Sequence, residues 1–376
     1  MLIVKILLGI FGLGVVVFFH ELGHFLAARL VGINVEAFSI GWGKPILKKK
    51  IGSCEYRLGI FPLGGYCKMQ GDSDYNNEAY EKLAQGIKPE EGSYHAASPA
   101  ARILVCFAGP FFNLVLAVIL LSFIWGIGFE INTFENKIKL LSEVNPGEVY
   151  PADIAGLKSG DRIIKIKKKN ISYYYEIQRS IGTKAKKEFP VTIERDGEIM
   201  QLNLSPLMDE DSGRGIIGIL PYNEEIISFR TPKLSIPGAV AKGVQDCYET
   251  LLDSITTLPL LFKGINLTKA VSGPVRITYM MGDFATQGFS RSIGAGFYIL
   301  VNFISLISIA LCVMNLLPLP ILDGGMIILF TVELIRRKPI PPKAVAVFQT
   351  CGMVIIFSLL IFALYGDIMY LFFTGK

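Results

Sequence analysis

Four long apolar segments divide the chain, and each is long enough to cross a lipid bilayer as a helix. A helix that spans the hydrocarbon core needs about 20 mostly apolar residues. The segments cover residues 2–31, 100–129, 293–335 and 345–373. The third is too long for one plain crossing and contains helix-breaking residues, namely Pro318, Pro320 and the pair Gly324-Gly325. The pattern predicts a polytopic α-helical membrane protein with four transmembrane spans.

Between the first two spans, residues 54–69 (CEYRLGIFPLGGYCKM) have the composition of β structure. They are rich in aromatic and branched residues, and Pro62 with Gly64-Gly65 interrupts them. We expect a β-hairpin within this segment. Because the segment is apolar, we also expect it to re-enter the membrane, where its backbone edges must contact protein or water.

Residues 130–222 change character, since charges return and short alternating strands appear. The expected strands are 137–144, 162–166, 189–195, 199–204 and 215–220. Asp196-Gly197 is a hairpin turn signal, and residues 173–181 have the pattern of a short helix. About ninety residues is an ordinary size for one small module, so we expect an inserted α+β domain.

The following region, 223–292, includes an amphipathic stretch at 235–265. Asp246, Glu249 and Asp253 in its middle disfavour a span and favour a helix along the membrane interface. The expected domains are a membrane core over 1–129, the soluble domain over 130–222, this interfacial region, and the rest of the membrane core over 293–376.

Composition agrees with a membrane protein and argues against nucleic acid as a partner. The 376 residues are 51% hydrophobic and 18% charged, whereas a soluble domain is usually about a quarter charged. The net charge is +5, and basic residues gather at the ends of apolar segments without a stripe of exposed aromatics. The lipid bilayer is therefore the expected environment.

Basic residues in the short loops predict the orientation. They cluster at 44–68, after the first span, and at 336–343, between the third and fourth spans. The positive-inside rule places both loops in the cytoplasm, and the even number of crossings between them makes the assignments agree. The soluble domain and both termini would then face the periplasm, as in a multi-pass protein of a bacterial inner (cytoplasmic) membrane.

The first span contains His20-Glu21-Leu22-Gly23-His24, an HExxH motif. On a helix, residues four apart project from one face, so His20 and His24 can bind one Zn²⁺ while Glu21 takes a proton from water. The chain has only three histidines, and chance would produce the motif about two times in a thousand. Ionisable groups at membrane depth are costly and usually functional. This favours a zinc site over a structural pair.

A catalytic zinc site needs a third protein ligand and an open position for water. The remaining histidine, His95, lies in a polar loop where a surface position is the simpler interpretation. Asp323 lies in NLLPLPILDGG at 315–325, between apolar helical stretches, where an unpaired carboxylate is costly. Asp323 is therefore the expected third ligand, and the alternative is a carboxylate in a water-lined turn.

Together these motifs resemble the site-2 protease family of intramembrane zinc metalloproteases, and within it the bacterial sigma-E regulator type. The pair HExxH and NxxPxPxLDGG carries the resemblance. FPLGGYCKM at 61–69, AGPFFN at 108–113 and VSGPV at 271–275 support it. The resemblance implies that His20, His24 and Asp323 hold the zinc, toward the cytoplasmic side, and that Glu21 activates water.

The resemblance also implies a substrate-binding set. Asn315 would hold the substrate backbone or stabilise the oxyanion. The segment 54–69, with Gly64 and Gly65, would be the family's membrane-reentrant hairpin and would add a strand to an unwound substrate. Asn113 is either a further substrate-binding residue or an amide that packs helices together, and both interpretations stay open.

Within the soluble domain, AGLxxGDxI at 155–163 resembles a PDZ domain in its circularly permuted bacterial form. Two features depart from the sigma-E regulator type, which usually has two such domains and commonly has glycine where Arg276 follows GPV. Both departures concern substrate identity. A PDZ-like domain either binds C-terminal peptides or limits the size of the substrates that reach the active site.

We therefore expect an intramembrane zinc endopeptidase that acts in regulated intramembrane proteolysis. Its partners would be single-span membrane-protein substrates already trimmed by another protease, such as anti-sigma factors or signal-peptide remnants. The alternative is a catalytically inactive, membrane-anchored PDZ scaffold, which gains nothing from buried ionisable groups. A metal transporter would need more intramembrane carboxylates or histidines and internal repeats, which the sequence lacks.

Overall fold

The computed structural model describes residues 2–71, 80–81, 83, 85–182, 187–209, 214–223, 225–259 and 273–373. Within these residues, four helices are long and apolar enough to cross a membrane, as predicted. They are α1 (Leu2–Leu30), α3 (Pro99–Ile127), α9 (Ile293–Asn315) and α11 (Pro342–Phe373). The third span ends earlier than expected, because α9 stops at Asn315 and a separate helix, α10 (Asp323–Arg336), follows the break.

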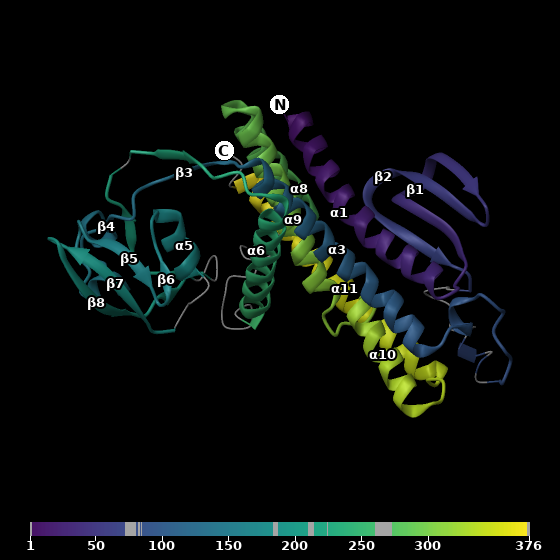
Figure 1. Ribbon diagram of the computed structural model, residues 1–376. Helices are drawn as coiled ribbons and strands as arrows, with labels where there is room; N and C mark the ends of the chain where they lie inside the picture. The colour runs from purple at the N-terminus through teal and green to yellow at the C-terminus, as the bar shows by residue number, and fades with distance from the viewer. Residues whose placement is uncertain are drawn as a thin grey trace. The chain divides into compact units, whose positions relative to one another are not determined.

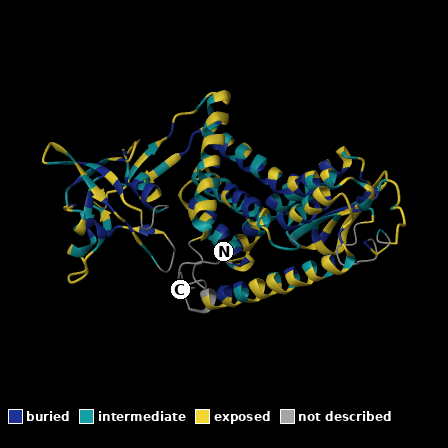
Figure 2. Cartoon of the chain, turned by 90° about the horizontal axis from the view of Figure 1, so that it is seen from below, coloured by how far each residue is buried: buried dark blue, intermediate teal, exposed yellow. Residues whose placement is uncertain are grey.

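The chain divides into two compact units. The first contains residues 1–127, 233–251 and 272–376, and the second contains residues 128–232 and 252–271. All four candidate membrane helices belong to the first unit. Helix α11, which leads to the C label in Figure 2, is mostly exposed, as expected for an apolar helix that faces lipid.

Glycines allow the helices of the first unit to approach closely. A Cβ atom at Gly23 of α1 would overlap the Ala108 carbonyl of α3, and one at Gly9 would overlap the Thr278 carbonyl of α8 (Pro274–Arg291). Small residues at such contacts favour helix association in a membrane, where packing replaces the hydrophobic effect. Figure 1 shows α1, α3, α8 and α9 gathered in this bundle.

Within its described residues, the region expected along the membrane interface contains two helices that differ in character. Helix α6 (Ile236–Thr257) covers the described part of the amphipathic stretch. Helix α8 packs into the bundle instead, because Met281 and Ala285 are fully buried with Val16 and Leu300 in one hydrophobic cluster. Its helical pattern within 223–292 was missed.

Asp367 of α11 anchors the start of α8. This buried carboxylate accepts hydrogen bonds from the backbone N–H groups of Gly273, Val275 and Arg276, at 2.8, 3.0 and 3.1 Å. A negative charge at a helix N-terminus is stabilised by the unpaired N–H groups and the helix dipole. The GPV part of the VSGPV motif therefore joins α8 to α11, while Val271 and Ser272 lie outside the described residues.

The hairpin predicted within 54–69 is wrong in its bounds. These residues form one strand, β2 (Cys54–Met69), which pairs with β1 (Val35–Ile51) across a turn at Gly52-Ser53. Two parts of β2, residues 55–58 and residues 65–68, both pair with residues 37–40 of β1. We call these two parts the arms of β2. The two arms run in opposite directions on either side of residues 37–40, so β2 reverses direction around β1 and its arms pair with β1. Gly64, between the arms, takes a left-handed φ of +100°.

The second unit is a small α+β domain. Its main sheet has the order β6-β5-β7-β8, formed by β5 (Arg162–Ile166), β6 (Lys169–Asn170), β7 (Phe189–Arg195) and β8 (Glu198–Leu204). Helix α5 (Tyr174–Gly182) contributes Ile177 and Ile181 to the same core as Ile163 and Val191. The short remaining pairs are β3 (Glu130–Thr133) with β12 (Ile227–Arg230), β4 (Ile138–Leu140) with β11 (Ile219–Pro221), and β9 (Leu207–Met208) with β10 (Gly215–Ile216).

Two predicted strands in this unit are shorter than expected. The strand predicted at 137–144 stops at Leu140 and continues as a 3₁₀ turn, and the one at 215–220 is split by Gly218, whose φ is +77°. The AGLxxGDxI motif follows the short helix α4 (Pro151–Ile154) and leads into β5. Its Asp161 is buried and accepts two 2.7 Å hydrogen bonds from Arg195, so the motif's aspartate supports the fold.

Candidate metal centre

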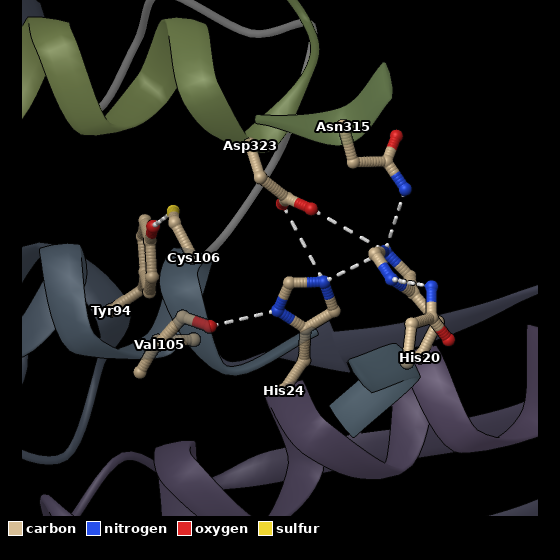
Figure 3. A network of polar contacts seen from close by, with 8 residues as sticks. His20, His24, Tyr94, Val105, Cys106, Asn315 and Asp323 are labelled. Atoms are coloured by element: carbon tan, nitrogen blue, oxygen red, sulfur yellow. Dashed lines mark hydrogen bonds and ion pairs between the residues drawn. The ribbon is translucent and has the colours of Figure 1, made fainter. Parts of the chain in front are cut away.

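Helices α1 and α10 bring the three expected metal ligands together. His20 and His24 lie one turn apart on α1, and Asp323 is the first residue of α10. Their ligand atoms all lie within 4.8 Å of one another. Figure 3 shows the two imidazole rings and the carboxylate facing one another. All three side chains are half-buried, which leaves room for a further ligand at the site.

The distances in this cluster fit a tetrahedral zinc ion. The Nε2 atoms of His20 and His24 are 3.2 Å apart, and the Asp323 carboxylate oxygens lie 3.4 Å from the first and 3.5 Å from the second. Ligand atoms about 2.0–2.1 Å from a tetrahedral zinc are about 3.4 Å from one another. Two imidazoles and one carboxylate also form a common catalytic zinc set, with the fourth position left for water.

The backbone of α3 orients His24. The Nδ1 atom of His24 lies 2.9 Å from the carbonyl oxygen of Val105. Because a carbonyl oxygen only accepts, Nδ1 carries the ring proton and Nε2 keeps its lone pair toward the cluster. This tautomer is the one that a metal ion requires.

The break between α9 and α10 places Asp323. A Cβ atom at Gly324 or Gly325 would overlap backbone carbonyls of residues 316–319, so the paired glycines let this loop fold tightly against the start of α10. Ile321 takes a φ of +77°, which a branched residue rarely adopts. Such strain is concentrated at functional sites. The loop ends at Asp323, which lies at the N-terminus of α10, where a negative charge is favoured.

Gly109 of α3 makes room for both imidazole rings. A Cβ atom there would lie 2.6 Å from Cε1 of His24 and 2.9 Å from Cε1 of His20, and it would overlap the His24 Nε2 atom. Pro110 follows inside the same helix, where it lacks the N–H group for one helical hydrogen bond. The AGPFFN motif signalled this segment, but sequence reasoning gave Gly109 no role, and the contribution of the Val105 carbonyl has no sequence signal at all.

The expected catalytic and substrate-binding residues lie around the cluster. Glu21 follows His20 on α1, and a Cβ atom at Gly65 of β2 would lie 3.0 Å from its Cγ atom. At Gly64, a Cβ atom would overlap the indole of Trp42. The side-chain nitrogen of Asn315, at the end of α9, is 3.5 Å from Nε2 of His20 (Figure 3).

Asn113 lies on the other side of His20. It is fully buried on α3, and its Nδ2 atom is 3.3 Å from Nδ1 of His20, the ring nitrogen that faces away from the cluster. Its side chain therefore contacts an expected ligand instead of an open surface.

His95 is not at the surface, so that expectation is wrong. The ring is half-buried between Tyr80 and Tyr94, at centroid distances of 5.0 and 5.7 Å. Burial and the positive charge of Arg102 lower the pKa of His95 to about 4. The ring is therefore neutral near pH 7, and it stands outside the cluster of ligand atoms that the described residues form.

Comparison with known proteins identifies the family. The sequence pattern of peptidase family M50 matches residues 8–359, which is nearly the whole chain. The chain belongs to peptidase family M50. M50 peptidases are the site-2 proteases and are zinc-dependent, so the recognition from HExxH and NxxPxPxLDGG is confirmed.

Curated relatives of this M50 peptidase carry the same description. A protein of Treponema pallidum is 30% identical over 98% of this chain and 100% of its own length. One from Campylobacter jejuni is 34% identical over 94% of this chain and 90% of its own length. One from Clostridium acetobutylicum is 30% identical over 97% of this chain and 98% of its own length. All three are named "Putative zinc metalloprotease". The family and the four apolar helices establish a multi-pass membrane zinc metalloprotease.

Proposed function

We propose that this M50 peptidase is an intramembrane zinc endopeptidase that cuts the transmembrane segments of other membrane proteins. The observation that carries the proposal is the cluster of His20, His24 and Asp323 at zinc spacing. Both histidines lie on α1, which is long and apolar enough to cross a membrane, and α3, which contacts both rings, is too. A peptide bond that reaches this site must belong to a segment that enters the bilayer.

Each residue around the cluster then has a defined task. Zinc, when bound, polarises the scissile carbonyl and lowers the pKa of water. Glu21 accepts the proton of the attacking water and returns it to the leaving amine. Asn315, with its Nδ2 atom 3.5 Å from Nε2 of His20, donates a hydrogen bond toward the charge that develops on the carbonyl oxygen.

Strand β2 is the proposed binding edge for an unwound substrate. Residues 65–69 pair with β1 along one edge, and the opposite edge is the one proposed to receive the substrate. Gly65 in this arm is adjacent to Glu21. An extended substrate that pairs with this edge exposes its peptide bonds, which a helix hides, beside the general base. Gly65 keeps a side chain away from Glu21, Gly64 allows the close contact with Trp42, and the strand would re-enter the membrane.

The proposed substrates are single-span membrane proteins that another protease has already shortened, such as anti-sigma factors or signal-peptide remnants. This would make the protein a component of regulated intramembrane proteolysis. An inactive scaffold with a PDZ-like domain is the second candidate, but it would not need three ligand atoms at zinc spacing in one cluster.

Replacement of Asp323 tests the ligand set directly. Asp323→Asn substitutes a neutral amide for an anionic ligand, so zinc affinity should fall by more than the roughly 10–100-fold that loss of a supporting contact to a ligand costs. The measurement is the zinc content of purified protein after dialysis against a chelator. Asp196→Asn, in an exposed turn of the second unit, is the matched control. Equal zinc retention in the two variants would show that another residue is the third ligand.

The proposed orientation has the active site toward the cytoplasm of a bacterium, with both termini and the PDZ-like domain in the periplasm. In a protein whose six native cysteines are replaced by serine, cysteines placed at the exposed positions Lys49 and Lys338 should react with a membrane-impermeant reagent only from the cytoplasmic side, and one at Glu198 only from the periplasmic side. Labelling in right-side-out and inverted vesicles measures this. Reaction of the Glu198→Cys protein from the cytoplasmic side would reverse the topology.

Removal of residues 130–222 tests whether the PDZ-like domain selects substrates. Every proposed catalytic residue lies in the first unit, and the deleted residues contain no histidine or cysteine. The deleted enzyme should therefore cut a short, trimmed membrane substrate as before and should also cut untrimmed substrates. Both substrates are assayed side by side with the two enzymes. A deleted enzyme that retains zinc but cuts neither substrate would make the domain part of the active conformation.

A further inference from the structure

Asn113 stands in a position that neither of the two interpretations from sequence describes. It is fully buried on α3, so it is not a surface for substrate. Its backbone carbonyl accepts a 2.7 Å hydrogen bond from the buried hydroxyl of Ser308 on α9. The residue is therefore fixed between α3 and α9, and its amide faces the ring of His20 on α1.

The position of the ring proton on His20 determines whether the Asn113 amide must accept or donate a hydrogen bond. Nε2 of His20 points at His24 and Asp323, so it needs its lone pair if it is to bind a metal ion. The ring proton then lies on Nδ1, which must donate to an acceptor. The near polar atom is the amide of Asn113, whose Nδ2 is 3.3 Å away.

The other atom of the Asn113 amide is the acceptor that His20 lacks. Its Oδ1 atom is buried and has no hydrogen-bond partner among the described residues. A buried polar atom without a partner is costly. A half-turn of the amide about the Cβ–Cγ bond exchanges the two atoms, and Oδ1 then accepts the Nδ1–H of His20. This one rotation satisfies both groups and leaves Nε2 of His20 with its lone pair.

His24 has the same arrangement, but its acceptor is a backbone carbonyl, which cannot exchange donor and acceptor atoms as an amide can. Its Nδ1 atom lies 2.9 Å from the Val105 carbonyl oxygen, also on α3. One helix thus supplies a backbone acceptor for one histidine and a side-chain amide for the other. Metal-binding histidines nearly always donate their second ring N–H to such an acceptor, which fixes the ring and raises its affinity for the metal.

We propose that Asn113 is a positioning residue that sets the tautomer of His20 through its side-chain oxygen and so raises the affinity of the site for zinc. The inference rests on the proposed role of His20 as a ligand. Asn113 does not touch the substrate or the reacting atoms, and its effect passes through His20. A helix-packing amide would have no need of an oxygen at this position.

Two variants of similar shape separate these roles. Asn113→Leu removes the acceptor and should lower zinc affinity about 10–100-fold. Asn113→Asp keeps an acceptor at the same place and should hold zinc within a few-fold of the unchanged protein. Competition with a chromogenic chelator, on the full-length protein in detergent, measures both. Ser305→Ala is the control, because Ser305 is buried on α9 but donates only to the Val301 carbonyl of its own helix.

A spectroscopic readout reports the tautomer itself. The chain has only three histidines, so ¹⁵N-histidine labelling gives few ring signals, and His20→Ala assigns one set. In the zinc-loaded protein the His20 Nδ1 signal should be that of a protonated, hydrogen-bonded nitrogen, and in Asn113→Leu that signal should shift.

The outcomes test the positioning role of Asn113 separately from the proposed role of His20 as a zinc ligand. If Asn113→Leu binds zinc as tightly as the unchanged protein, or if Asn113→Asp loses zinc as fully as Asn113→Leu does, the positioning role is wrong. If His20→Ala itself retains full zinc affinity, the proposed ligand set fails, which is a separate result. Loss in Asn113→Leu, rescue in Asn113→Asp and the shifted His20 signal together support the inference.

Discussion

Glu21→Gln should abolish proteolysis while zinc stays bound. Glutamine has nearly the same shape as glutamate, but it cannot accept the proton of the attacking water near pH 7. A positioned general base contributes roughly 10²–10⁴-fold to a rate, so turnover of a membrane substrate should fall by at least about 100-fold. The proposed ligands His20, His24 and Asp323 are untouched, so zinc content should not change. Turnover in reconstituted vesicles and metal analysis of the same sample measure the two quantities.

Glu36→Gln is the matched control for this variant. Glu36 is an exposed carboxylate on β1 that pairs with Lys68 at 2.7 Å, and exposed ion pairs contribute little. Its loss should leave turnover unchanged. Zinc loss in Glu21→Gln would make Glu21 a ligand or a support for one, and retained turnover would remove it from the proton transfer.

The sequence predicted the membrane spans, and it singled out three residues that the structure brings together, because both depend on strong local patterns. Long apolar runs define α1, α3, α9 and α11 without reference to any other segment. HExxH places the two proposed histidine ligands on one helix face through the helical period alone. Asp323 was identifiable because a carboxylate between apolar stretches needs a partner, although it lies about 300 residues from His20 in the chain.

Features that depend on contacts between distant segments could not be predicted from local sequence patterns. Strand β1 was missed as the partner of β2, because Lys48, Lys49 and Lys50 give its second half the composition of a loop. Helix α8 was assigned to the membrane interface, because burial of Met281 and Ala285 depends on contacts with other helices. His95 was placed at the surface, since its neighbours in sequence are polar and Tyr80, which packs on its ring, is distant.

Gly109 shows why the motif in α3 could be noticed but not explained. A glycine inside a helix is a cost of about 1 kcal/mol relative to alanine, and the sequence offers no reason for it. The reason is the pair of rings on α1, which occupy the space that a Cβ atom would need. Such a requirement exists only once α1 and α3 are packed together.

Gly109→Ala should therefore remove zinc from an otherwise folded protein. The added methyl group would overlap Nε2 of His24, which is held from behind by the Val105 carbonyl and cannot move away without losing that hydrogen bond. Overpacking of this kind costs about 1–3 kcal/mol, which corresponds to roughly 10–100-fold in zinc affinity. Turnover should fall with zinc occupancy, and excess zinc should restore part of it. Chelator competition and a zinc titration of activity measure both effects.

Gly126→Ala provides the comparison within the same helix. A Cβ atom at Gly126 would have its nearest neighbour at 3.9 Å, in ordinary contact with Ala239. Both substitutions favour the helical backbone equally, since alanine has the higher helix propensity. Thermal stability of the zinc-free protein should then be similar or higher in Gly126→Ala, whereas Gly109→Ala also carries the cost of the overlap with His24, and only Gly109→Ala should lose zinc. If both variants retain zinc and activity, the contact between α3 and the two imidazoles does not set the geometry of the site.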